Sequence, residues 1–412
     1  MITINNNMYV LDTDNTSYAF AVLGSGQLEH LYYGRKLHAN EAVMTEKHTF
    51  IPGNTNVYNK DYSSYSLEDV CLEMSSLGKG DIREPFIEVT YPNGSSTTDM
   101  VFDRAEIIQG KEEYDTLPGS YDDNGEVEQL VIYLKDRNYN LTLELHYYVY
   151  EKCDIITRSA KLVNSGNESV RLERLMSMQL DLNESDYELS FFNGAWAREM
   201  NRSRIPIRAG KYVNESVTGT SSNRANPFFM IGRSSTTEDY GECYGFNLIY
   251  SGNHYEAAQV NSYGKLRLVS GINPATFSYI IEAGKCFEAP EAVLTYSYKG
   301  YNRMSHNMHE FVRKHIVRGS WRDKERPVLI NSWEAAYFNI NERKLVKLAK
   351  AAKDTGVELF VMDDGWFGER NDDTSSLGDW TPNSRKLPNG IAGIADKIKE
   401  SGLKFGIWVE PE

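Results

Sequence analysis

The chain has 412 residues, a formal net charge of -14, and 41% hydrophobic residues. This length exceeds what one hydrophobic core usually supports, so we expect two domains. The acidic balance disfavours contact with phosphate backbones and anionic lipids, so no nucleic acid and no membrane partner is expected.

Neither the N-terminus nor any apolar run has the pattern of a targeting signal. The first residues, MITINNNMYVLDTDNTSYAF, show no basic segment followed by an apolar one, and no apolar run reaches the roughly 20 residues of a membrane helix. The cysteines lie far apart without a C-x-x-C spacing, which favours reduced thiols: Cys71, Cys153, Cys243 and Cys286. A cytoplasmic location is therefore expected.

Residues 1–300 carry the pattern of β-strands. In Leu141–Tyr150 the residues Leu141, Leu143, Leu145, Tyr147 and Val149 share one face, as in a half-buried strand. Similar segments follow, bounded by Gly, Asn, Ser or Pro turns. The pattern predicts a large antiparallel β-sandwich.

The period changes near residue 302. Met304, Met308, Phe311 and Val312 form one helical stripe, which predicts a linker helix over residues 301–326. His306 and His309 lie three residues apart on this helix but have no third ligand nearby, so no metal site is predicted.

From Pro327 onward, strands alternate with helices. The segments PVLINSW, VELFVM and LKFGIWV are predicted strands, and NERKLVKLAKAAKDTG and IAGIADKIKESG are predicted helices. In the first helix Leu345, Leu348, Ala349 and Ala352 should face inward, with Asn339 and Glu342 at its start. This alternation predicts a parallel sheet over residues 327–412.

Two aspartates end the second of these strands. Asp363 and Asp364 open a long connection to Gly390, and long connections inside compact domains are usually functional. A glycosidase needs two carboxylates that flank one glycosidic bond. Adjacent residues of an extended chain point to opposite sides, so Asp363 and Asp364 cannot easily serve as that pair. Gripping different hydroxyls of one sugar suits them better.

Four of the six tryptophans follow or end these strands: Trp333, Trp366, Trp380 and Trp408. Their flat apolar faces match the C–H faces of a pyranose ring, although packing between sheet and loops would equally account for large aromatic side chains. Glu410 and Glu412 lie after the third strand, where either a catalytic or a structural hydrogen-bonding role is open.

Several segments closely resemble the bacterial α-galactosidases of glycoside hydrolase family 36, the melibiose and raffinose hydrolases. They include RPVLINSWEAAYFNI, ELFVMDDGWFGERNDDTSSLGDW and LKFGIWVEPE, and the resemblance covers nearly the whole chain. It implies an N-terminal β-supersandwich followed by a (β/α)8 barrel, of which residues 327–412 would supply about three βα units. It also implies retaining hydrolysis without metal or cofactor, and often a homotetramer. By this resemblance Asp363, Asp364, Trp333 and Trp408 contact the terminal galactose of an α-galactoside oligosaccharide.

The catalytic residues of that family are not matched here. The nucleophile belongs to a Lys-Trp-Asp motif that this sequence lacks, and the acid/base aspartate follows later. We therefore expect an N-terminal portion of an α-galactosidase that hydrolyses nothing alone. The alternatives are an α-N-acetylgalactosaminidase, a galactosyl transferase of the raffinose type, or a non-catalytic galactoside-binding protein built on the sandwich.

Overall fold

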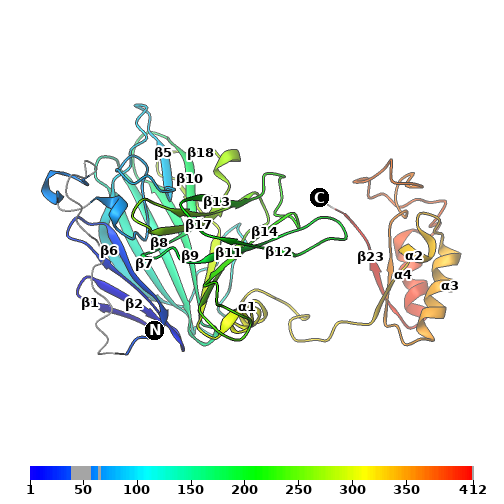
Figure 1. The fold of residues 1–412 in the computed structure, drawn as a ribbon. Helices are drawn as coiled ribbons and strands as arrows, with labels where there is room; N and C mark the ends of the chain where they lie inside the picture. The colour runs from blue at the N-terminus through cyan, green and yellow to red at the C-terminus, as the bar shows by residue number, and fades with distance from the viewer. Residues whose placement is uncertain (39–56, 64–65, 411–412) are drawn as a thin grey trace. The chain divides into compact units, whose positions relative to one another are not determined.

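The computed structural model describes residues 1–38, 57–63 and 66–410 (Figure 1). The chain divides into two compact units, Met1–Val317 and Arg318–Glu412. The predicted domain limits were 1–300 and 327–412 with a linker between, so the unit boundary falls inside that linker.

The first unit is built from antiparallel strands in three sheets, as the alternating pattern predicts (Figure 1). One sheet has four strands in chain order: β1 (Ile2–Asn5), β2 (Met8–Asp12), β3 (Thr16–Val22) and β4 (Leu28–Arg35). A second has the order β13 (Gly210–Glu215), β16 (His254–Val260), β17 (Leu266–Ile272), β10 (Val170–Leu182) and β18 (Tyr279–Ile281), with β5 (Ile87–Thr90) also on β10.

The largest sheet has ten strands. Its order is β12 (Asn201–Pro206), β11 (Glu188–Asn193), β14 (Ala225–Gly232), β15 (Cys243–Ile249), β20 (Glu291–Ser297), β9 (Ile155–Asn164), β8 (Leu141–Tyr150), β7 (Glu128–Asp136) and β6 (Met100–Gln109), with β19 (Cys286–Glu288) on β9. Short 3₁₀ helices connect strands at Lys60–Tyr62, Leu67–Asp69, Glu151–Cys153 and Pro274–Thr276.

Strand β8 shows how the sequence pattern translates into packing. Leu141, Leu143, Leu145, Tyr147 and Val149 are all buried in the main core, as the alternation predicts. Tyr148 and Tyr150 on the opposite face are also buried, because they pack in a second cluster that includes Phe311. The strand is therefore half-buried at its start and fully buried at its end.

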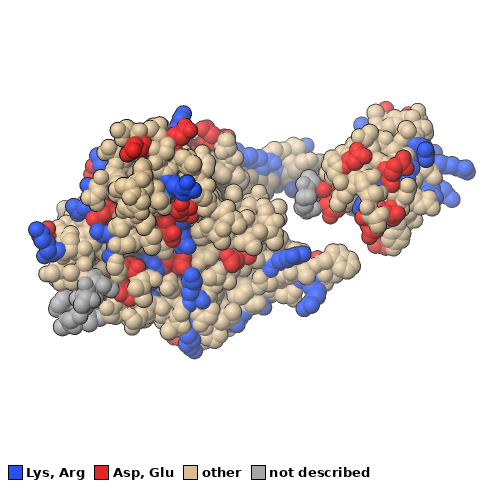
Figure 2. Space-filling view, turned by 90° about the horizontal axis from the view of Figure 1, so that it is seen from above, with Lys and Arg blue, Asp and Glu red and all other residues tan. Residues whose placement is uncertain are grey.

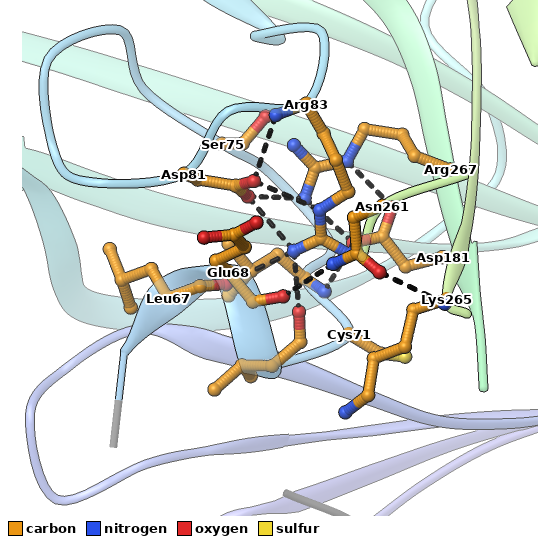
Figure 3. A network of polar contacts seen from close by, with 12 residues as sticks. Leu67, Glu68, Cys71, Ser75, Asp81, Arg83, Asp181, Asn261, Lys265 and Arg267 are labelled. Atoms are coloured by element: carbon orange, nitrogen blue, oxygen red, sulfur yellow. Dashed lines mark hydrogen bonds and ion pairs between the residues drawn. The ribbon is translucent and has the colours of Figure 1, made fainter. Parts of the chain in front are cut away.

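A buried network of charges joins the loop before β5 to the second sheet (Figure 3). The Arg267 guanidinium donates to both carboxylate oxygens of Asp181 at 2.8 and 2.7 Å and lies 2.8 Å from Asp81. Arg83 adds ion pairs of 2.9 Å to Asp81 and 3.1 Å to Asp181. Two guanidinium groups thus balance two carboxylates in a site closed to water, where an unpaired charge would be strongly destabilising.

Helix α1 (Gly300–His315) belongs to the first unit. Met304 and Phe311 are buried and Met308 packs beside them, whereas Val312 is exposed. Helix α1 is therefore shorter than the predicted linker helix of residues 301–326. Its apolar stripe packs on strands of the first unit.

The second unit contains a three-stranded parallel sheet in the order β21 (Leu329–Asn331), β22 (Leu359–Met362) and β23 (Lys404–Ile407). Helix α2 (Trp333–Ala336) follows β21, α3 (Glu342–Lys353) leads to β22, and α4 (Gly390–Glu400) leads to β23. Leu345, Ala349 and Ala352 of α3 are buried, and Leu348 packs against the same core. Its N-cap is Asn341, not Asn339, because the Asn341 side chain accepts the Lys344 amide at 2.9 Å.

On the face shown in Figure 2, acidic and basic side chains are interspersed over the first unit. No helix in the described part of the chain is both long and apolar enough to span a membrane. All four cysteines are free thiols, and only Cys286 is exposed.

Candidate functional site

The carboxyl ends of the three parallel strands lie at one edge of their sheet, as parallel pairing requires. Asn331 ends β21, Asp363 and Asp364 follow β22, and Trp408 follows β23. The Trp408 amide donates to the Met362 carbonyl at 2.9 Å, which places Trp408 beside the strand end that carries the aspartates.

Asp363 is buried, with 7% of its surface exposed, and is held by the end of β21. Its amide donates to the Ser332 hydroxyl at 3.0 Å, and its carboxylate accepts the Asn331 side-chain amide. The same Asn331 side chain accepts the Trp333 amide at 2.7 Å. Asn331 therefore connects two of the predicted site residues, Asp363 and Trp333.

Asp364 is held by an arginine that the sequence analysis did not single out. Arg370 donates from Nε to both Asp364 oxygens at 3.0 and 3.2 Å, and from Nη2 to Oδ2 at 2.9 Å. Each of these two residues is only 5% exposed. Hydrogen bonding to Asp364 raises the pKa of Arg370, as expected for a charge-assisted pair.

The two adjacent carboxylates are thus electrostatically different. The charge of Asp364 is balanced by Arg370, whereas Asp363 makes no ion pair with any described residue. Asp363 instead receives hydrogen bonds from neutral groups, including the Asp364 amide at 2.7 Å. A buried carboxylate with only neutral donors suits a ligand rich in hydroxyl groups, because hydroxyls donate without adding charge.

Lys386 fixes the loops around the aspartates. Its ammonium donates to the carbonyls of Phe338, Gly365 and Arg370 at 3.0, 2.8 and 2.8 Å. Burial lowers the pKa of Lys386, and the nearby Asp364 opposes that shift. No sequence pattern marks Arg370 or Lys386, since single basic residues in a polar loop are usually solvent-exposed.

Gly365 lets the chain leave the strand end. Its φ is +90°, and a Cβ there would lie 3.0 Å from the Phe338 backbone. Any other residue would be strained in this conformation and would push against the loop after β21. The Gly after the paired aspartates is therefore a geometric requirement.

Of the four tryptophans, Trp366 is buried, and Trp333, Trp380 and Trp408 are half-buried. Trp366 is 2% exposed and belongs to the core, where it stacks on Trp380 with ring centroids 6.2 Å apart. Its indole Nε1 donates to the Trp408 carbonyl at 2.9 Å. Trp333 and Trp408 are half-buried and keep part of their surface accessible. The packing interpretation thus applies to Trp366, and a contact role stays a prediction for Trp333 and Trp408.

The connection from Asp363 to Gly390 is less irregular than its length suggests. Phe367 and Leu387 lie in the core, and the Gly368 amide donates to the Thr381 carbonyl at 2.8 Å. Of the two glutamates after β23, Glu410 is exposed, and Glu412 lies outside the described residues.

Comparison with known proteins identifies both parts of the chain. Residues 26–282 match the glycosyl hydrolase family 36 N-terminal domain, and residues 286–412 match the melibiase family. The chain is 41% identical to α-galactosidase AgaA of Geobacillus stearothermophilus over 98% of its own length and 55% of that protein's.

Solved structures agree with this comparison. Crystal structures of family 36 α-galactosidases from Geobacillus stearothermophilus superpose over nearly the whole chain. That of AgaB has a TM-score of 0.95 at 39% identity and covers 100% of this chain and 57% of its own. An AgaA variant in complex with raffinose has a TM-score of 0.94 at 40% identity, covering 98% and 56%. The chain thus spans about half the length of the curated relatives it matches. The match of residues 26–282 to the family's N-terminal domain shows that the chain belongs to glycoside hydrolase family 36.

Proposed function

We propose that this chain supplies the galactose-binding part of an α-galactosidase that removes terminal α-D-galactosyl residues, as in melibiose and raffinose, with retention. The relatives named above are α-galactosidases, and one of their structures holds raffinose. The observation that carries the proposal is the convergence of Asn331, Asp363, Asp364 and Trp408 at one edge of the parallel sheet.

Each of the proposed contact residues has a distinct task. Asp363 accepts hydroxyl hydrogens of galactose, since its charge is uncompensated among the described residues. Asp364, whose carboxylate is oriented by Arg370 and by the Gly365 amide, is proposed to accept a neighbouring hydroxyl of the same sugar. Trp333 and Trp408 offer apolar faces to the C–H face of the ring.

The chemistry itself would need two further carboxylates. Retaining hydrolysis uses one carboxylate as nucleophile and a second as acid and then base, about 5–5.5 Å apart on the two sides of the scissile bond. Asp363 and Asp364 lie side by side at one strand end, which suits them to a binding role rather than to these two catalytic roles. We therefore expect the 412-residue chain to bind galactose and to hydrolyse nothing.

The second unit is proposed to be the first three βα units of a (β/α)8 barrel. Its parallel strands are connected by α3 and α4, and its polar residues lie at the carboxyl ends of the strands, where barrel enzymes carry their active sites.

A homo-oligomer, a tetramer by the family's pattern, and a cytoplasmic location are proposed as well. The four free cysteines support the latter, and sedimentation of the purified protein would check the former.

The test combines binding and turnover. Galactose binding to the second unit is followed by tryptophan fluorescence, since Trp333 and Trp408 lie at the site. We expect Asp363→Asn to weaken binding about tenfold, the loss of one to two charge-assisted hydrogen bonds. Asp396→Asn, an exposed position on α4, is the matched control and should bind like the unchanged chain.

Turnover is measured with p-nitrophenyl α-D-galactoside and the corresponding N-acetylgalactosaminide. Release of p-nitrophenol by the purified chain would refute the claim that it is inactive alone. Equal galactose affinity of Asp363→Asn and the control would refute the assignment of the site.

A further inference from the structure

A polar cavity within the first unit lies beside the N-terminal end of helix α1. It measures about 240 Å³ and is bordered by the start of β3, the end of β20 and the first turns of α1. Arg303 on α1 and Lys299 just before it contribute cationic side chains, and Asp154 contributes a carboxylate. Tyr296 and Tyr298 add aromatic rings. The galactose site proposed above belongs to the other unit and shares none of these residues.

The Asp154 carboxylate is already saturated with hydrogen-bond donors. Its Oδ1 accepts the Thr13 hydroxyl and the Asn15 amide, both at 2.9 Å. Its Oδ2 accepts the Asn15 side-chain amide at 2.9 Å and Nη2 of Arg303 at 3.2 Å. An ionised carboxylate offers about four acceptor positions, so Asp154 has none left for a ligand. Asp154 therefore orients Arg303 and does not compete for a cation.

The two cationic side chains remain available to a ligand. Lys299 is exposed, and Arg303 keeps 41% of its side chain exposed. Arg303 has five N–H donors, and among the described residues it uses only one hydrogen bond, to Asp154. The Lys299 ammonium makes no hydrogen bond to a described residue and lies 5.4 Å from the centroid of the Tyr298 ring, which also lines the cavity. Two accessible charged donors thus lie at one cavity.

Arg35, at the end of β4, adds positive charge beside the same wall. Its guanidinium lies 4.1 Å from the Tyr298 ring centroid, so this ring contacts cations from two segments of the chain. Of the described side chains that line the cavity, two are cationic and only Asp154 is anionic. The local charge is therefore positive, although the whole chain carries a net charge of -14. Such a cavity attracts an anion and repels a cation.

The neutral groups of the wall offer few acceptors. The Tyr296 hydroxyl donates to Glu242 at 2.6 Å, and the Ser297 hydroxyl accepts the Lys299 amide at 3.0 Å. Oδ1 of Asn307 has no partner among the described residues, but this atom is buried and a ligand in the cavity would not reach it. The cavity thus presents mainly charged donors, which is the pattern that binds phosphate and carboxylate groups.

The shape of the donors and the size of the cavity narrow the ligand. An arginine guanidinium presents parallel N–H donors that match two oxygens of a phosphate or a carboxylate, and a lysine ammonium adds a further charge. Pockets for drug-sized molecules measure about 300–1,000 Å³, so this smaller cavity suits a compact molecule. From these features we propose that the first unit binds the phosphate or carboxylate group of a small metabolite. Arg303 and Lys299 are the donors, and Asp154 holds Arg303 in place.

The variant Lys299→Met tests this proposal without disturbing the fold. The Lys299 side chain is exposed and its ammonium has no hydrogen bond to a described residue, so only the charge at the cavity is lost. Lys285→Met is the matched control, because Lys285 is exposed on the same unit, does not line the cavity, and changes the net charge equally. Thermal unfolding of both variants should match that of the unchanged chain.

Binding is measured on the whole chain by isothermal titration calorimetry at low ionic strength, with D-glucose 6-phosphate, D-glucuronate and D-glucose as probes. We expect Lys299→Met to weaken binding of the anionic probes about three- to tenfold, the contribution of one exposed charge-assisted hydrogen bond, and Lys285→Met to leave it unchanged. Arg303→Lys keeps the charge but loses the paired donors, so it should weaken binding as well. Added salt should weaken binding to the unchanged chain, and D-glucose should bind far more weakly than either anion.

Three outcomes would overturn the proposal. They are no binding of either anion, equal binding by Lys299→Met and Lys285→Met, and binding of D-glucose as tight as that of its charged derivatives. Tighter binding of the 6-phosphate than of the glucuronate would support a phosphate group as the ligand, and the reverse would support a carboxylate. Because the probes are derived from glucose and the variants lie in the first unit, failure of this site is distinguishable from failure of galactose binding at Asp363.

Discussion

Asp363 and Asp364 are neighbours in the chain but occupy different electrostatic environments. Arg370 grips both oxygens of Asp364, and Asp363 receives only neutral donors among the described residues. The Arg370 guanidinium places a positive charge beside these adjacent carboxylates, which reduces the repulsion between them.

The ion pair leads to a prediction for Asp364→Asn. We expect this change to lower the free energy of unfolding of the second unit by about 3 kcal/mol, because it leaves the buried Arg370 charge uncompensated. Chemical denaturation followed by tryptophan fluorescence measures the effect. Asp396→Asn should change the free energy by less than about 0.5 kcal/mol, as exposed positions usually do. A similar loss in both variants would contradict the structural role of the pair.

For single residues, the sequence predicts where a functional side chain lies along the chain better than it predicts which groups that side chain contacts. Placing Asp363 and Asp364 after a buried strand needs only the apolar run before them. Arg370 and Lys386 were missed because their roles depend on a loop that folds back onto the strand end, and no periodicity encodes that path. Trp366 and Trp408 have the same local signal, yet only tertiary packing places one in the core and leaves the other half-exposed.

The elements of the second unit are fixed mainly by their apolar stripes and caps. Helix α3 buries Leu345, Ala349 and Ala352 at helical spacing, so its existence follows from the sequence. Its start was predicted from Asn339 and Glu342, whereas the chain begins the helix after Asn341. Two asparagines stand near this start, and only the backbone path decides which one caps it.

Replacing the cap gives a prediction for one element. Asn341→Ala should destabilise the second unit by about 1 kcal/mol, because the Lys344 amide loses its acceptor. Asn389 precedes α4 without a capping bond, and its side chain donates only to Glu342, at 3.1 Å on the surface. Asn389→Ala loses this exposed bond alone, so it is the comparison and should cost less. The midpoints of urea unfolding of the two variants decide between these expectations.

The charge network of the first unit makes that unit sensitive to acid. Burial alone would raise the pKa of Asp81, but Arg267 and Arg83 lower it below its ordinary 3.8. The pKa of Glu73 is lowered from 4.5 in a similar way, by Arg158 and His30 against burial. Stability from such groups is present above their unfolded pKa values and is lost as the pH falls through the lower folded values.

We therefore expect the free energy of unfolding of the first unit to fall below about pH 4.5, by up to about 1.4 kcal/mol per pH unit for each proton taken up. Urea unfolding between about pH 5 and pH 3 measures the slope. Asp81→Asn cannot titrate, so it should be less stable at neutral pH but lose less stability in acid. If the free energies of unfolding of the unchanged chain and of Asp81→Asn fell equally with falling pH, the loss of stability in acid would not come from Asp81.

For the whole molecule, the two units have separate cores. Among the described residues each hydrophobic cluster draws its members from one unit only. The sequence predicts this division through the change from a strand period to alternating strands and helices. It assigns α1 to the linker, because α1 has the amphipathic pattern of a connecting helix, whereas α1 buries its apolar stripe on the first unit.

Separate cores predict that residues 1–317 fold without the rest of the chain. This fragment should show a cooperative thermal transition, and its unfolding temperature should lie within a few degrees of that of the first unit in the whole chain. Circular dichroism at a strand wavelength measures it. A fragment ending at residue 300 is the comparison, since it lacks α1 and leaves Tyr150 and Ile155 uncovered. Equal stability of the two fragments would show that α1 is dispensable.

The thiols of the chain have a practical consequence. Burial raises the pKa of Cys71 and Cys243 to about 12 and that of Cys153 to about 11, which keeps these groups unreactive near neutral pH. Cys286, on β19, is the exposed one. A maleimide dye would therefore attach at one place on the first unit, while five of the six tryptophans emit from the second unit and Trp196 emits from the first. In a Trp196→Phe variant, energy transfer from the remaining tryptophans to the dye would report the separation of the units in solution and its change on adding sugar.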